Sequence, residues 1–173
     1  MHNHFLELIE QWTAGDFTGA AYIFAYDNNA GGFKYMQKLT SSSSSDLDKF
    51  GFAVAIKEKY VVAGAPQNDR FGMNAGAAYV FQKGGSSDDD FVPVYDLVSP
   101  DPAPSALFGW SVSVNSKGVI AVGAKGDRTA KGSVYIFKPA GSGWTHVFTL
   151  EPNVTASFFN VGNAGWDVAI DDL

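Results

Sequence analysis

A hexapeptide of the pattern Gly-x-x-Tyr-x-Phe occurs three times, and its spacing constrains the fold more than any other feature of the chain. The three copies start 57 and 56 residues apart, at Gly19, Gly76 and Gly132. A second landmark keeps the same period and is found at Phe50-Gly51, Phe108-Gly109 and, with alanine as its first residue, Ala164-Gly165. A period of this length is typical of proteins that stack copies of one supersecondary unit.

Each repeat is expected to contain four strands. The first strand follows the aromatic-glycine pair, at about 50–56, 108–114 and 164–170. The second is expected at 60–65 and 119–124, and the third is the Gly-x-x-Tyr-x-Phe run. The second and third strands are almost continuously apolar, which predicts that both of their faces are covered.

The fourth strand of each repeat is more mixed and is expected at 33–39, 91–97 and 144–150. Lys34, Asp96 and His146 interrupt its apolar residues, as in a half-exposed strand. Pro93 lies inside one copy. Because proline has no N–H to donate to a neighbouring strand, it belongs on a sheet edge. The fourth strand is therefore predicted to be the outermost.

These features predict an all-β chain of β-propeller blades, each made of four antiparallel strands. A β-solenoid is the alternative, but it would have shorter repeats and fewer hairpin turns. The whole chain, 1–173, is expected to form a single domain with repeats at about 19–75, 76–131 and 132–173. Residues 4–12 fit either the second strand that the first repeat lacks or a short amphipathic helix.

The strands expected amount to about three blades. Propellers usually have four to eight blades. Two interpretations stay open: the chain is part of a larger propeller, or two copies of it close one ring.

The same landmarks resemble the FG-GAP repeat family, which is named for its Phe-Gly and Gly-Ala-Pro motifs. The middle repeat carries both motifs, as Phe50-Gly51 and Gly64-Ala65-Pro66, and the next carries Phe108-Gly109 and Gly123-Ala124-Lys125. The resemblance implies a β-propeller, best known from the head of integrin α subunits. It also implies a binding or adhesion module that is extracellular, at the cell surface or in another lumenal compartment.

One departure from the family concerns calcium. Many members carry an Asp-x-Asp-x-Asp-Gly loop between the first and second strands, which supplies the oxygen ligands that calcium prefers. The corresponding turns here are Lys57-Glu58-Lys59 and Asn115-Ser116-Lys117-Gly118. We therefore expect neither a metal site nor a cofactor.

Composition narrows the functional classes. The net charge of −6 and the scattered basic residues disfavour nucleic-acid binding. The absence of cysteine excludes a thiolate nucleophile, and no apolar run is long enough to cross a membrane as a helix. The histidines are His2, His4 and His146, and no pair of residues stands out as an acid and a base. A non-catalytic protein-interaction module is the favoured function, ahead of a carbohydrate-binding propeller and of a polysaccharide-acting enzyme.

The candidate binding residues are few. Trp110 and Trp166 follow the motif glycine, as does Phe52, so they either pack between blades or form an aromatic floor for a peptide or sugar. Asp46 and Asp48 precede Phe50-Gly51 and could line the same face. Asn153 begins an Asn-x-Thr sequence that fits N-glycosylation. The expected partner is a protein or further copies of the chain, with a glycan as the alternative.

Overall fold

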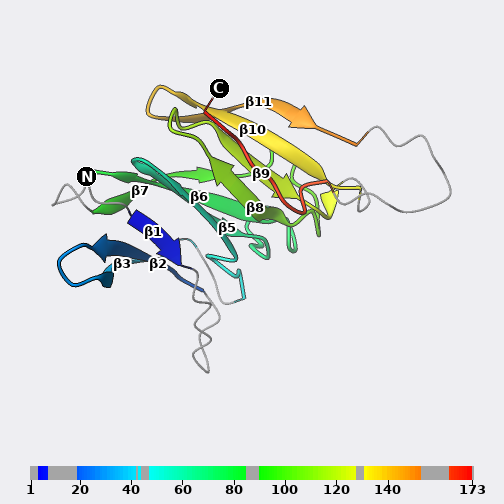
Figure 1. The fold of residues 1–173 in the computed structure, drawn as a ribbon. Helices are drawn as coiled ribbons and strands as arrows, with labels where there is room; N and C mark the ends of the chain where they lie inside the picture. Colours follow the sequence, from blue (N-terminus) through cyan, green and yellow to red (C-terminus); the bar gives the residue numbers. More distant parts are fainter. Residues whose placement is uncertain are drawn as a thin grey trace.

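A computed structural model of the chain describes residues 4–7, 19–41, 43, 47–84, 90–127, 131–152 and 164–172, with only the backbone for 4–7 (Figure 1). These ranges contain eleven strands. They are β1 (His4–Glu7), β2 (Ala21–Asp27), β3 (Gly32–Leu39), β4 (Ala53–Lys57), β5 (Tyr60–Ala65), β6 (Ala77–Lys83), β7 (Phe91–Leu97), β8 (Phe108–Val114), β9 (Ile120–Ala124), β10 (Ser133–Ala140) and β11 (Gly143–Leu150).

The strands form three antiparallel sheets, as the repeats predict. Their orders are β1-β2-β3, β4-β5-β6-β7 and β8-β9-β10-β11, so neighbours in the sequence are neighbours in each sheet. The mixed strands β3, β7 and β11 lie at sheet edges, which confirms the prediction for the fourth strand of each repeat. The chain is therefore all-β, and its four-stranded sheets are consistent with consecutive blades of a partial propeller.

A β-bulge recurs at one point of every repeat. The pairing between the third and fourth strands shifts at Ile23/Phe24, at Val80/Phe81 and at Ile136/Phe137. Pro93 pairs with Phe81, directly beside the second of these bulges. Its missing N–H is thus placed on an edge strand where the regular pairing is already interrupted.

The N-terminal segment supplies a strand to the first sheet. β1 pairs antiparallel with β2, with Phe5 opposite Phe24 and Glu7 opposite Tyr22. Of the two interpretations of residues 4–12, a strand therefore applies to 4–7, and residues 8–12 lie outside the described part of the chain.

The prediction of a regular strand at 164–170, the first strand of the last repeat, is wrong. Only Ala164 forms a bridge, with Gly132, and residues 165–172 have no strand assignment. Among the described residues, no second strand of its own repeat pairs with this segment, and it forms no ladder with β8. Instead, side chains of the third sheet hold it: Ser111 Oγ donates to the Gly165 carbonyl at 2.8 Å, and Ser113 Oγ accepts from the Ile170 N–H at 3.1 Å. Figure 1 shows this red segment running along β8.

The second sheet is covered on both faces, and β5 shows why its sequence is continuously apolar. All six residues of β5 are buried. Tyr60 and Val62 pack with β8, β9 and β10, whereas Val61, Ala63 and Ala65 pack with β2 and β3. Successive residues of a strand point to opposite faces, so a strand between two sheets needs apolar residues at every position.

The glycines of the repeated motifs are the places where neighbouring sheets come closest. Isolated parallel bridges join Gly19 to Phe50, Gly76 to Phe108 and Gly132 to Ala164, one at each junction. A Cβ on Gly76 would lie 2.1 Å from the Phe108 carbonyl oxygen, and one on Gly109 would lie 2.2 Å from that of Ala77. Both distances are far below van der Waals contact, so only glycine fits these positions.

Substitution of Gly64 tests this close approach without changing backbone strain. A Cβ on Gly64 would lie 2.0 Å from the Gly109 carbonyl oxygen, whereas one on Gly32 would meet nothing within 4 Å. Neither glycine has a left-handed φ. We expect Gly64→Ala to lower the free energy of unfolding by about 4 kcal/mol and Gly32→Ala to change it by less than about 0.5 kcal/mol. Urea unfolding of the two variants measures the difference, and equal effects would contradict the packing described.

Candidate functional site

An aromatic row crosses the junctions between repeats and is the candidate binding site. It consists of Phe52, Trp110 and Trp166, each of which follows a motif glycine. The ring centroids of Phe52 and Trp110 are 4.5 Å apart, and those of Trp110 and Trp166 are 5.7 Å apart. The structure thus brings together two residues that the sequence nominated, Trp110 and Trp166, with a third at the equivalent position.

The stacking of the repeats explains the row. The parallel bridges place Gly76 beside Phe108 and Gly132 beside Ala164, so neighbouring repeats pack at equivalent positions. The residue after each motif glycine then lies beside its counterpart in the next repeat. This register explains why the row exists. Its chemistry depends on which residue follows the motif glycine in each repeat.

Two lysines accompany the aromatic row. The Lys125 Nζ lies 3.0 Å from the centroid of the Trp110 ring and 4.5 Å from that of the Trp166 ring. The Lys49 Nζ lies 6.0 Å from the centroid of the Phe52 ring. An ammonium over an aromatic face is attracted by the ring quadrupole, most strongly by tryptophan. The site is therefore aromatic and cationic.

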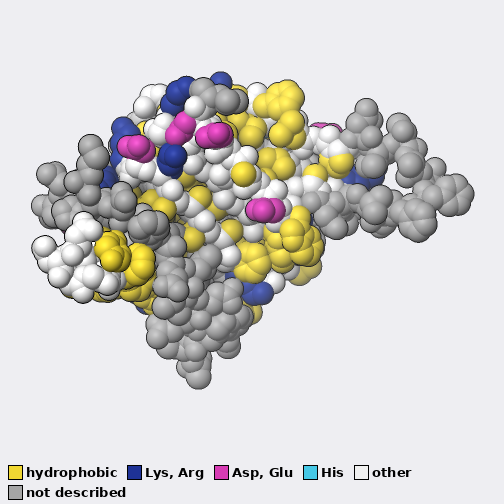
Figure 2. Space-filling view, viewed as in Figure 1, with side chains coloured by type: hydrophobic (Ala, Val, Ile, Leu, Met, Phe, Trp, Pro, Cys, Tyr) yellow, Lys and Arg dark blue, Asp and Glu magenta, His cyan; other side chains and the backbone are white. Residues whose placement is uncertain are grey.

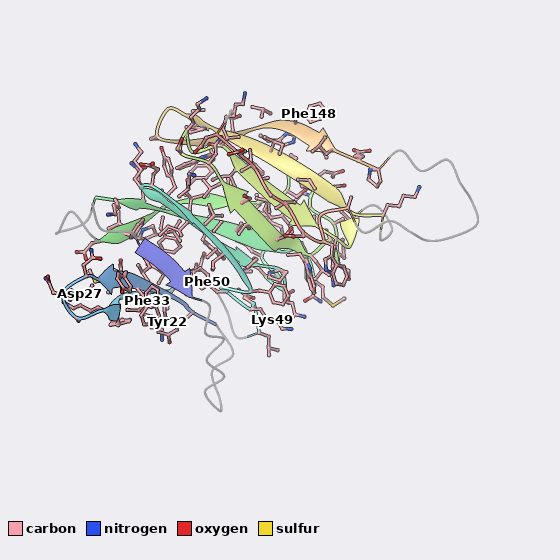
Figure 3. All side chains as sticks on the ribbon, viewed as in Figure 1. Tyr22, Asp27, Phe33, Lys49, Phe50 and Phe148 are labelled. Atoms are coloured by element: carbon pink, nitrogen blue, oxygen red, sulfur yellow. The ribbon has the colours of Figure 1, made fainter. Side chains whose placement is uncertain are left out.

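Burial and the charge of Lys49 both act on Lys125. Partial burial lowers the pKa of Lys125 because desolvation disfavours its charged form, and the positive charge of Lys49 lowers that pKa further. Figure 3 labels Lys49, and in the same region Figure 2 shows hydrophobic side chains gathered beside a basic one.

The rings of the row are unequally accessible. Trp166 is 56% exposed, whereas Phe52 and Trp110 are half-buried. The planes of adjacent rings are inclined by 49° and 53°, and Lys125 lies against Trp110. The three rings therefore do not form one flat surface, and Trp166 offers most of the aromatic surface that a ligand can reach.

Asp48 is part of a buried hydrogen-bond network. Its side chain is 3% exposed, and Asn68 Nδ2 donates to its carboxylate at 2.6 Å. The next repeat has a related pair, in which the Tyr135 hydroxyl donates to the Asp127 carboxylate at 2.5 Å. These contacts fix the loops that follow the second strands, so a structural role accounts for Asp48. Asp46 and Asn153 lie outside the described residues.

Lys49 and Lys125 were not among the residues nominated from the sequence. A signal for Lys125 was present, because it replaces the proline of the Gly-Ala-Pro motif at the position of Pro66. That substitution places a cation at the end of β9. Its contact with two tryptophans depends on how the neighbouring repeats pack, which the motif alone does not reveal.

The two turns at the position of the family's calcium loop have other sequences and other hydrogen bonds. Lys57-Glu58-Lys59 closes the β4–β5 hairpin with Glu58 at φ 56°. In the next turn the Asn115 side chain accepts hydrogen bonds from the N–H groups of Lys117 and Val119, at 3.1 and 2.9 Å. Across the described ranges, no group of three or more His, Asp or Glu residues is placed to hold a metal ion.

Two further observations concern His146 and membrane spans. His146 Nε2 lies 2.9 Å from Thr149 Oγ1, and its ring packs near Tyr135 and Phe137. None of these contacts involves Phe52, Trp110 or Trp166. In the part of the chain that the structure describes, no helix has the length and hydropathy needed to span a membrane.

Comparison with known proteins identifies the repeats. The model of a family described as FG-GAP repeat matches residues 33–81 and 93–137, which together make up more than half of the chain. The matched segments include both Phe-Gly motifs, the Gly-Ala-Pro motif and the last two Gly-x-x-Tyr-x-Phe runs. No curated protein matches the chain.

The coupling between the two lysines can be tested directly. In Lys49→Met the repulsion is removed, so we expect the pKa of Lys125 to rise, while the depression caused by desolvation remains. Titration of the Lys125 side-chain NMR signals measures the shift. Lys59→Met is the control, because Lys59 lies over a different ring, that of Tyr60. An unchanged pKa of Lys125 in Lys49→Met would show that the two ammonium groups do not interact.

Proposed function

The chain belongs to the FG-GAP repeat family, and we propose that it is a non-catalytic protein-interaction module of the adhesion type. The observation that supports this function is the row of Phe52, Trp110 and Trp166 with Lys49 and Lys125 beside it. Tryptophan is among the residues that dominate protein–protein binding energy, and aromatic residues are enriched in interfaces.

The arrangement of the rings and of Lys125 supports protein binding over sugar binding. Sugar-binding sites stack a flat sugar face on an open aromatic ring. Here adjacent rings lean on each other, and Lys125 lies 3.0 Å from the centroid of Trp110. A protein surface can instead place one apolar side chain against Trp166 and polar groups near the lysines.

The chemistry of the row also supports a non-catalytic role. Its members are aromatic rings and ammonium groups, whereas hydrolysis of a glycoside needs a pair of carboxyl groups flanking the bond. Asp48, which precedes the row in the chain, is buried and accepts a hydrogen bond from Asn68. The module therefore binds its partner without transforming it.

The partner is a protein, either a different one or a further copy of this chain, and the location is extracellular or at the cell surface. Support for both comes from the family, whose best-known members act in adhesion. Neither a metal nor a cofactor takes part in this function.

A carbohydrate-binding function is the second candidate, and one observation favours it. Trp166 is 56% exposed, so one ring of the row is open to a sugar. The same variant tests both functions, because Trp166 is the accessible ring in either case.

We expect Trp166→Ala to weaken partner binding about tenfold or more, as loss of a central aromatic does in protein interfaces. The measurement is surface plasmon resonance of purified variants against proteins found in an array of extracellular proteins from the same source. Phe148→Ala is the matched control. Phe148 is 58% exposed, close to the 56% of Trp166, but it lies on β11, far from Lys49 in Figure 3.

The outcome separates the two functions. Loss of protein binding in Trp166→Ala, with Phe148→Ala unchanged, supports the protein-interaction module. Binding to a glycan array that disappears in Trp166→Ala, without any protein ligand, would replace it by the carbohydrate function.

A further inference from the structure

We propose that the aromatic row and its two lysines recognise an acidic segment of the protein partner, in which Asp or Glu residues adjoin an apolar side chain. This inference rests on the proposed protein-interaction function and names the chemistry that its site selects. It follows from the positions of Lys49 and Lys125 relative to the three rings and to the carboxylates of the chain.

The two ammonium groups are paired with rings. Among the described residues, ion pairs join Lys57 to Asp172 at 3.1 Å and Arg70 to Asp96 at 3.2 Å. Neither pair involves Lys49 or Lys125. The nearest described carboxylate in sequence to Trp166, that of Asp167, accepts a hydrogen bond from the Val168 N–H at 2.9 Å.

An ammonium over an aromatic ring keeps its hydrogen-bonding capacity. The ring attracts the positive charge through its π face but offers no lone pair of an oxygen. A lysine ammonium has three N–H donors and no acceptor, and a carboxylate accepts only. Lys125 is therefore placed to donate charge-assisted hydrogen bonds to a partner's carboxylate.

The repulsion between the lysines favours an anion at this site. The two ammonium groups lie over adjacent rings, Lys49 over Phe52 and Lys125 over Trp110, and the charge of Lys49 disfavours the charged form of Lys125. A carboxylate that approaches both would relieve this repulsion. Lys125 is also half-buried against two tryptophans, so it loses less freedom on binding than an extended surface lysine does.

The surroundings indicate a short acidic segment instead of a long polyanion. The chain carries a net charge of −6, so its overall field repels nucleic acids, anionic polysaccharides and anionic membranes. At the aromatic row, Lys49 and Lys125 attract negative charge locally. Next to it, the 56% exposed Trp166 offers apolar surface to a neighbouring side chain of the partner.

The experiment uses the whole chain and a fluorescent peptide that alternates Glu and Leu, with the matching Gln and Leu peptide as the uncharged probe. We expect the Glu peptide to bind and Lys125→Met to weaken it about tenfold, the loss expected from one charge-assisted hydrogen bond. Lys125→Arg keeps the charge and should retain binding. Lys59→Met is the control, because it removes a lysine that lies 5.2 Å from the centroid of a different ring, Tyr60.

Three results would overturn the inference: equal binding of the Glu and Gln peptides, equal affinity of Lys125→Met and Lys59→Met, or a preference for heparin or phosphatidylserine vesicles over the peptide. If a protein partner is still lost in Trp166→Ala, the interaction function stands and only the acidic specificity fails. If Trp166→Ala also retains its partner, the proposed function fails as well. Thermal melts of each variant show whether a loss of binding reflects unfolding.

Discussion

The contact on which the rest of the structure depends is the approach of one repeat's backbone to the next at the motif glycines. Gly76 and Gly109 both lie where an added Cβ would stand about 2 Å from a carbonyl oxygen of the neighbouring repeat. At that separation no other residue type fits, so the glycines fix how far apart the sheets are. The parallel bridges at Gly19, Gly76 and Gly132 repeat this geometry at each junction.

The candidate site is a consequence of the same packing. Because the sheets meet in a constant register, the residue after each Phe-Gly or Ala-Gly pair lies beside its counterpart in the next repeat. Aromatic residues at this position then form the row of Phe52, Trp110 and Trp166, and Lys125 reaches two of its rings. The packing of the repeats thus determines where the aromatic row lies, and we propose that a partner recognises its rings and the charges beside them.

Most of the fold could be predicted from the sequence because the repeat is carried by local patterns. Strands β5 and β7 have the predicted bounds, since a continuous apolar run marks β5 and turn residues flank β7. The segment after Ala164 was predicted as a strand from its motif alone, but a strand also needs a partner. The site was only partly predictable: Trp110 and Trp166 were found by their place in the repeat, whereas the role of Lys125 depends on side-chain contacts across a junction. The sequence suggested that Asp48 could line the same face as the tryptophans, whereas the structure buries it against Asn68.

The most direct test of this account is amide hydrogen exchange at a junction between sheets. The Phe108 N–H donates to the Ala75 carbonyl oxygen at 3.0 Å, across the junction of the second and third sheets. Val80, which is fully buried within β6, reports on the interior of the second sheet alone. If the sheets form one cooperative stack held at the glycines, the Phe108 amide is protected as strongly as that of Val80. Rapid exchange at Phe108 with a protected Val80 would show that the sheets open independently and would contradict the account.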